Sequence, residues 1–162
     1  CLVGSEMCIR DRKKTGKKIT WPKGAKIDGL PIRTLKENKL KIFINKPVKE
    51  VFEYSLESNN VPKWIKSIKV EIPEERPVKL GTKLKNIGFN SNEWNSYEMI
   101  AFDFPNTFIL KRLNGDYFVR YTCREKDNGT EFEYFEWAEK GDLDGLMEMS
   151  ALELLKKLVE EE

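Results

Sequence analysis

The sequence predicts an α+β fold in which an antiparallel sheet of about six to seven strands wraps around one long C-terminal helix, with two short helices after the first strand. Three observations predict this fold. Residues 39–45 alternate apolar and polar side chains, as a half-buried strand does. Further strand-like stretches follow, separated by turn signals at short intervals. Residues 142–162 then carry apolar side chains at helical spacing.

The length of 162 residues corresponds to one domain. An apolar fraction of 40% can build its core and a charged fraction of 35% can cover it, which is typical of a soluble globular protein. No run approaches the roughly 18 consecutive apolar residues of a membrane span, and no secretory signal is recognisable. We therefore expect no transmembrane segment and a cytoplasmic location. The oligomeric state is left open.

Residues 1–12 resemble translated sequencing-adapter sequence and are excluded from the fold prediction. Without them, Cys123 is the cysteine that remains, so no disulfide framework is expected. Residues 13–38 contain scattered proline and glycine and are predicted to be a basic, irregular extension. The ordered domain is predicted to span residues 39–162.

The positive charge of the chain is concentrated in this extension. Residues 13–28 hold six lysines and one aspartate, a net charge of +5, whereas residues 29–162 carry −3. Since residues 1–12 are neutral, these two values account for the formal +2 of the whole chain. The body is mildly acidic, and no nucleic-acid partner is expected.

The first strand is followed by the two predicted helices. A helix over residues 47–56 begins at a proline, which a first helical turn tolerates, and Asn45 is its candidate cap. A second short helix over residues 59–66 is entered through Pro62 and turns Trp64 inward.

The predicted meander is built from six strand-like stretches at residues 68–72, 82–89, 93–104, 107–113, 117–124 and 130–138. Asn114–Gly115 and Asp127–Gly129 are strong hairpin signals, because Asn and Gly tolerate the positive φ angles of tight turns. Consecutive strands joined this tightly pair antiparallel. We expect the first strand to close the sheet at one edge.

The predicted terminal helix covers residues 142–162, about 30 Å at 1.5 Å per residue. Its apolar stripe consists of Leu143, Met147, Ser150, Ala151, Leu154, Leu155 and Leu158. Two short helices cannot cover such a stripe, so the helix is predicted to lie across the concave face of the sheet.

Local motifs accompany this order of elements. Residues 44–54 read Ile-Asn-Lys-Pro-Val-Lys-Glu-Val-Phe-Glu-Tyr, residues 60–64 read Asn-Val-Pro-Lys-Trp, and Gly-Thr pairs occur at residues 81–82 and 129–130. As a set, over residues 39–158, these features resemble the START-like (SRPBCC) superfamily, which includes the polyketide cyclase/dehydrase and birch-pollen allergen families. The resemblance implies the helix-grip fold.

The superfamily includes lipid carriers, hormone receptors, cyclases and chaperone co-factors, so the fold alone does not select a function. What the resemblance implies first is binding or transport of a small hydrophobic molecule or lipid in an internal cavity. An enzyme of the cyclase/dehydrase type, working by acid-base chemistry, is one alternative. A protein-interaction module of the chaperone-ATPase-activator type is another, and whether the protein is an enzyme stays open.

The sequence contains no histidine, which removes the commonest general base and metal ligand. It has no phosphate-binding glycine loop and no Cys or His pair at metal spacing, so no cofactor or metal is expected. The side chains left for acid-base work on a carbonyl compound are Glu98, Asp103, Arg112, Arg120, Tyr121 and Tyr134. Arg120 is predicted to face solvent, and a buried Cys123 is expected to be unreactive. No catalytic residue is assigned.

Aromatic and aliphatic side chains facing the inside of the sheet are the candidates for a ligand-binding cavity. The predicted lining residues are Phe52, Trp64, Phe89, Trp94, Phe108, Leu110, Tyr117, Val119, Tyr121, Phe132, Tyr134, Met147 and Leu154.

Overall fold

The computed structural model describes residues 2–3, 6–8, 25–27, 30–31, 36–143 and 145–162, and the chain divides into two compact units, residues 1–35 and 36–162. In the first unit, β1 (Leu2–Val3) pairs with β2 (Glu6–Cys8), and β3 (Ala25–Ile27) pairs with β4 (Leu30–Pro31). Residues 36–38 of the predicted extension belong to the second unit, and the rest of the adapter-like segment and extension lies outside the described residues. The strands β3 and β4 occur where irregular backbone was expected.

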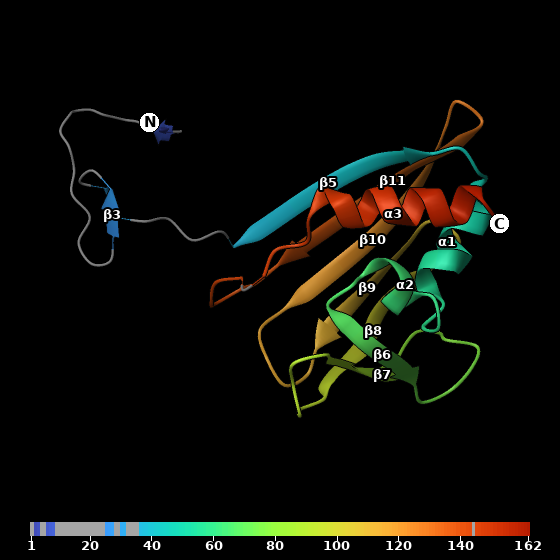
Figure 1. Ribbon diagram of the computed structural model, residues 1–162, viewed down its shortest axis with the longest axis horizontal. Helices are drawn as coiled ribbons and strands as arrows, with labels where there is room; N and C mark the ends of the chain where they lie inside the picture. The colour runs from blue at the N-terminus through green and yellow to red at the C-terminus, as the bar shows by residue number, and fades with distance from the viewer. Residues whose placement is uncertain (1, 4–5, 9–24, 28–29, 32–35, 144) are drawn as a thin grey trace. The chain divides into compact units, whose positions relative to one another are not determined.

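The second unit is built on a seven-stranded sheet (Figure 1). Its strands are β5 (Glu37–Ile44), β6 (Ile68–Pro73), β7 (Lys83–Gly88), β8 (Asn95–Asp103), β9 (Thr107–Arg112), β10 (Phe118–Lys126) and β11 (Gly129–Trp137). Their order is β5-β11-β10-β9-β8-β7-β6, and all neighbours are antiparallel. The predicted meander is confirmed, with the first strand of this unit at one edge.

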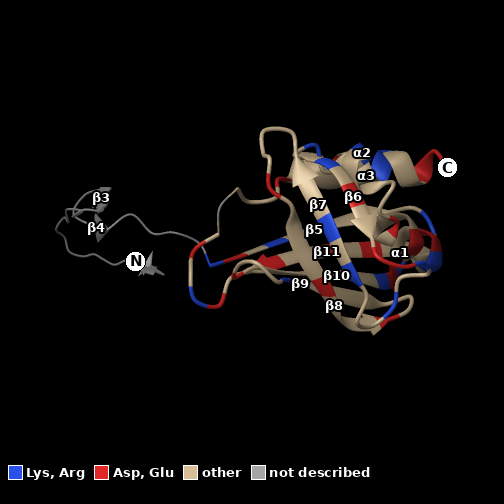
Figure 2. Cartoon of the chain, turned by 90° about the horizontal axis from the view of Figure 1, so that it is seen from below, with Lys and Arg blue, Asp and Glu red and all other residues tan. Residues whose placement is uncertain are grey.

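The turns between the strands follow the local sequence. Asp127 and Asn128 have φ angles of 50° and 63° between β10 and β11, the left-handed values that the hairpin signal predicts. Acidic and basic residues are interspersed along the strands (Figure 2). The helices α1 (Val48–Leu56) and α2 (Val61–Trp64) follow β5 as expected.

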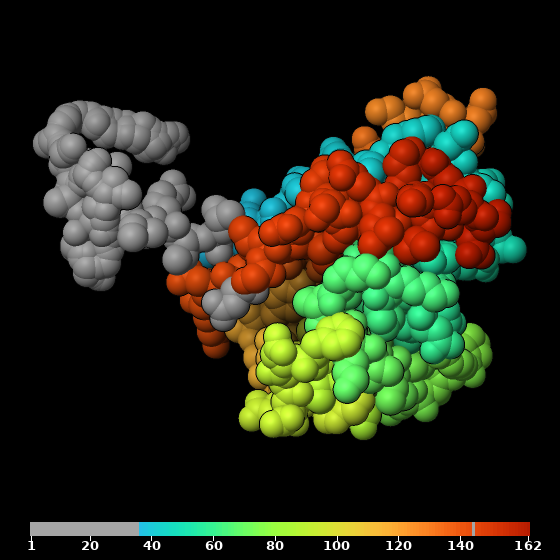
Figure 3. Space-filling view, in the orientation of Figure 1, coloured from blue at the N-terminus to red at the C-terminus, as the bar shows by residue number. Residues whose placement is uncertain are grey.

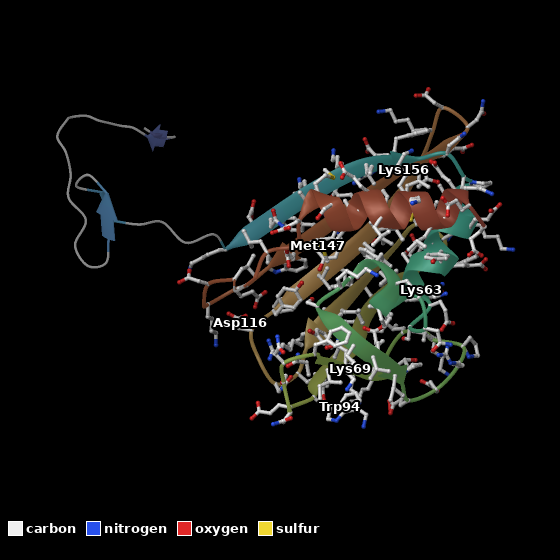
Figure 4. All side chains as sticks on the ribbon, in the orientation of Figure 1. Lys63, Lys69, Trp94, Asp116, Met147 and Lys156 are labelled. Carbon is white, nitrogen blue, oxygen red and sulfur yellow. The ribbon has the colours of Figure 1, made fainter. Side chains whose placement is uncertain are left out.

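The C-terminal helix is shorter than the sequence predicts. Helix α3 covers Met149–Glu160, about 18 Å long, so Leu143 and Met147 of the predicted stripe precede it. Side chains elsewhere satisfy the backbone of the preceding segment. The Asp116 carboxylate accepts hydrogen bonds from the backbone N–H groups of residues 139–141, and Figure 4 shows Asp116 beside this segment.

Asn45 is not a helix cap either. The residue at the N-cap of α1 is Pro47, and no side chain caps the helix. Instead, the backbone N–H of Asn45 donates to Glu160 Oε2 at 2.7 Å, which ties the end of β5 to the last turn of α3.

Helix α3 lies against β5, α1 and α2 and crosses the same side of the sheet as both short helices (Figure 1). It buries Leu152, Leu155 and Val159. Beneath α1 the core is aromatic, since the ring of Phe52 makes edge contacts with those of Phe102, Phe104 and Phe108 at centroid distances of 5.3–5.7 Å. In the described residues, no helix combines the length and the apolar character needed to cross a bilayer.

Candidate functional site

A cavity of about 720 Å³ lies between the concave face of the sheet and the N-terminal part of α3. Its floor comes from β8 to β11, and its sides come from the α2–β6 connection and from residues 145–148 before α3. In Figure 3 the surface is hollowed between the orange segment that leads into α3 and the green α2–β6 segment. A small molecule can therefore reach the inner face of the sheet from solvent.

The structure brings eight of the predicted lining residues to this cavity: Trp64, Leu110, Tyr117, Val119, Tyr121, Tyr134, Met147 and Leu154. The tyrosines and Val119 come from neighbouring strands, since Tyr121 pairs with Tyr134 and Val119 with Leu110 in the register of the sheet. The alternation of side chains along β10 and β11 thus places them on one wall.

The other five predicted residues do not line the cavity. Phe52, Phe108 and Phe132 are almost completely buried in the closed core next to it. Phe89 is 65% exposed in the loop after β7. Trp94 lies at the surface, where the Lys85 Nζ is 4.6 Å from the centre of its ring (Figure 4).

Glu136 is a buried carboxylate in the cavity wall, on β11. It accepts three hydrogen bonds, from Tyr117 Oη at 2.7 Å, from Asn38 Nδ2 at 2.8 Å and from the Met147 backbone N–H at 2.7 Å. Asn38 Nδ2 also donates to the Met147 carbonyl oxygen at 3.0 Å. Glu136 therefore fixes the segment that borders the opening of the cavity as well as one tyrosine inside it.

The tyrosine hydroxyls form a chain that leads to this carboxylate. The hydroxyl oxygens of Tyr117 and Tyr134 are 3.0 Å apart. Because the Tyr117 O–H donates its hydrogen bond to Glu136, the Tyr134 O–H is the donor between the two tyrosines. Burial raises the pKa values of Tyr117, Tyr121 and Tyr134 well above 10, so these side chains stay neutral at physiological pH. They offer a ligand neutral hydroxyl groups.

Glu71 is a second buried carboxyl group of the cavity wall, on the edge strand β6. Ser58 Oγ donates to its Oε1 at 3.0 Å and Asn86 Nδ2 to its Oε2 at 3.3 Å. Burial raises the pKa of Glu71 and outweighs both hydrogen bonds, which lower it. This carboxyl group can hold a proton at a higher pH than a solvated glutamate does.

Arg112 lines the cavity from the end of β9 and is half-buried. Its Nη2 donates to Asn95 Oδ1 at 2.6 Å and its Nε to Asn114 Oδ1 at 3.4 Å. Trp64 also lines the cavity, and its fully buried Nε1 has no hydrogen-bond acceptor among the described residues.

The remaining acid-base candidates lie elsewhere. Asp103 is exposed, and neither it nor Glu98 lines the cavity. Arg120 is on the outer face of the sheet, where its Nη2 donates to Glu133 Oε2 at 3.0 Å. Burial raises the pKa of the Cys123 thiol to about 12, so the thiolate is scarce. Among the described residues, no group of three or more Cys, Asp or Glu side chains could hold a metal ion.

Sequence reasoning missed Glu71, Glu136 and Asn86. The sequence pattern could have indicated Glu136, because this residue follows Phe132 and Tyr134 on the inner face of β11 at a period of two residues. The sequence pattern could not have indicated Glu71. Its apolar neighbours Val70 and Ile72 are 38% and 45% exposed, whereas the glutamate is buried. Edge strand β6 thus reverses the usual pattern of apolar side chains inside.

The sequence matches no protein-family model, and a search of curated proteins gives no significant match. Solved structures do match. Ara h 8.0201 gives a TM-score of 0.55 at 13% identity, over 78% of this chain and 98% of that one. CalU16 from Micromonospora echinospora gives 0.54 at 15% identity, over 76% of this chain and 75% of that one.

StfQ, a di-domain ARO/CYC from the steffimycin biosynthetic pathway, gives a TM-score of 0.61 at 12% identity, over 79% of this chain and 51% of StfQ. At this level of identity the likeness concerns the fold. The chain has the helix-grip fold that its motifs predict, and it shares this fold with these three solved structures.

Proposed function

We propose that the protein binds a small, largely apolar molecule in the cavity between its sheet and α3. The observation that carries this proposal is the open volume of about 720 Å³ inside the fold. Pockets for small molecules measure roughly 300 to 1,000 Å³ and are mostly apolar, with a few polar groups that fix orientation. Leu110, Val119 and Leu154 supply apolar wall, and Tyr134 and Glu136 supply polar groups.

The test is a fluorescence titration of the full chain with N-phenyl-1-naphthylamine, an uncharged probe that brightens in apolar surroundings. We expect saturable uptake by the wild type and at least a tenfold loss of affinity in Val119→Trp and Leu154→Trp, which fill the cavity from the sheet and from the helix. Ile100→Trp is the matched control, because Ile100 is exposed and does not line the cavity. Circular dichroism checks that each variant is folded.

Two results would contradict binding in this cavity. One is the absence of probe uptake by the wild type together with the absence of any co-purifying small molecule in native mass spectrometry. The other is unchanged uptake by both folded cavity-filling variants. A lipid or an aromatic metabolite recovered from the wild type would support the proposal and identify the ligand class.

A second candidate function is acid-base catalysis on a bound carbonyl compound, and Glu71 is the observation that favours it. Its carboxyl group is buried, lines the cavity and has a pKa that burial raises, so it can hold a proton at a higher pH than a solvated glutamate does. The interaction-module alternative has less support, because a module of that type would fill its interior rather than leave it open.

Catalysis by Glu71 predicts that Glu71→Gln keeps probe binding but accumulates unconverted substrate. We would express wild type, Glu71→Gln and the exposed-site control Glu125→Gln in the same cells and identify the bound small molecules by mass spectrometry. Different molecules in the wild type and in Glu71→Gln, with Glu125→Gln matching the wild type, are expected of an enzyme. Recovery of the same molecule from all three would leave binding as the function and rule out this role for Glu71.

A further inference from the structure

The polar side chains of the cavity form a belt across one end of the concave face. The belt runs through six neighbouring strands or their ends and consists of Glu136, Tyr117, Arg112, Tyr97, Asn95, Asn86 and Glu71. The register places Arg112 opposite Tyr97, and Asn86 opposite both Asn95 and Glu71. Arg112 therefore stands in the middle of the belt, with one carboxyl group toward each end.

The guanidinium of Arg112 is held in place by uncharged partners. Both hydrogen bonds that it makes to described residues go to amide oxygens, those of Asn95 and Asn114. Asn114 Nδ2 is itself tied to the Trp94 carbonyl oxygen at 3.3 Å, and its Oδ1 also accepts from the Ser96 backbone N–H at 3.1 Å. These contacts orient the guanidinium without neutralising its charge.

The carboxyl groups of the belt are engaged in other hydrogen bonds. Glu136 accepts from Tyr117, Asn38 and Met147, and Glu71 accepts from Ser58 and Asn86. Glu71 also has a raised pKa, caused first by burial, which favours its neutral form and lowers its repulsion of an anion.

Tyr97 also suits a ligand that accepts hydrogen bonds, because it is part of the cavity wall. The hydroxyl of Tyr97 stays protonated, since burial raises its pKa. A half-buried guanidinium pairs with a carboxylate through charge-assisted hydrogen bonds, often two at once, and desolvation strengthens such a pair.

We propose that the ligand of this cavity carries an anionic group of the carboxylate class and that Arg112 binds this group while the apolar walls hold the body of the molecule. The proposal rests on the proposed binding function. It makes Arg112 the residue that selects acids over uncharged molecules of the same shape.

The test compares two competitors that differ in charge but hardly in shape, 2-naphthoate and 2-naphthamide. Each displaces N-phenyl-1-naphthylamine from the full-length wild type, Arg112→Gln, Arg112→Lys and Lys111→Gln. Lys111→Gln is the matched control, because Lys111 is the neighbouring residue on β9, exposed and absent from the cavity wall. Direct titration with the uncharged probe shows whether the cavity of each variant is intact.

We expect the wild type and Lys111→Gln to prefer naphthoate to naphthamide. Arg112→Gln should weaken the affinity for naphthoate by about tenfold or more, which is the usual contribution of a hydrogen bond to a charged group. It should change the affinities for naphthamide and for the probe less than twofold. Arg112→Lys should retain part of the preference. Two results would overturn the role of Arg112 while leaving the binding function intact. One is equal affinity of the wild type for the two competitors, and the other is an equal loss of affinity for both competitors in Arg112→Gln. Failure of the probe to bind the wild type would instead contradict the binding function itself.

Discussion

Glu133 is a buried acid outside the cavity, on the outer face of β11. Its carboxylate accepts hydrogen bonds from Arg120 at 3.0 Å and Arg124 at 3.1 Å, and Lys41 Nζ lies 3.9 Å away. Burial opposes ionisation of Glu133, but the hydrogen bonds and charges of the two arginines outweigh it and lower its pKa below 4.5. Arg120, which was predicted to face solvent, thus pairs with Glu133 in this cluster. Its guanidinium carbon also lies 5.0 Å from the centre of the Phe135 ring.

The lowered pKa of Glu133 predicts a pH dependence of stability. A carboxyl group whose pKa is lower in the folded state stabilises the fold above its unfolded pKa of about 4.5, and this contribution is lost as the pH falls through the folded pKa. Glu133→Gln should therefore reduce the free energy of unfolding by about 1 to 2 kcal/mol at pH 7 and flatten its decline below pH 4.5. Urea unfolding between pH 7 and pH 3 measures both effects.

Glu131→Gln is the control, because Glu131 occupies the same strand and the same face and is less buried. It should change stability less than Glu133→Gln at pH 7. An unchanged acid slope in Glu133→Gln would show that the cluster does not set the pH dependence.

At the scale of elements, the β10–β11 hairpin is tied closely to β5. Gly129 begins β11, and a Cβ atom at this position would lie 2.6 Å from Cζ of Phe43 and 2.8 Å from the backbone oxygen of Ile44. The next residue, Thr130, donates from its Oγ1 to the Lys46 carbonyl oxygen at 2.7 Å. This glycine permits the edge strand to approach the turn.

Gly129→Ala should therefore destabilise the fold by about 1 to 3 kcal/mol, because the backbone of β5 must move away to admit the methyl group. Gly141→Ala is the control, since a Cβ there would meet the nearest atom, Asp116 Oδ2, at 3.9 Å, an ordinary contact. Urea midpoints of the two variants provide the comparison. Equal midpoints for Gly129→Ala and the wild type would mean that β5 yields without cost.

The length of α3 shows where local pattern and structure diverge. The apolar spacing of Leu143 and Met147 predicts helix from residue 142 onward, whereas the helix begins at Met149. Two features of the structure account for the difference. Glu136 accepts a hydrogen bond from the backbone N–H of Met147, inside the segment that would form the first turns, and φ of Gly145 is +65°, outside the helical range.

At the scale of the whole molecule, the cavity results from an uneven distribution of large side chains over the concave face of the sheet. The aromatic side chains packed around Phe52 close the end beneath α1. At the other end, α3 begins too late to cover the sheet, and the polar belt centred on Arg112 takes the place of a closed core. The fold is thereby closed at one end and open to solvent at the other. The cytoplasmic location remains a prediction.

The sequence by itself determined the seven strands of the main sheet, their antiparallel order and the two short helices, because alternation, proline positions and hairpin residues such as Asn128 act over a few neighbouring positions. It also identified Tyr117, Tyr121 and Tyr134 as inward-facing. Only the tertiary structure decided that Phe52 belongs to a closed core while Glu71 faces a cavity. That distinction depends on how much space remains between six curved strands and a shortened helix. No local sequence pattern predicts the size of that space.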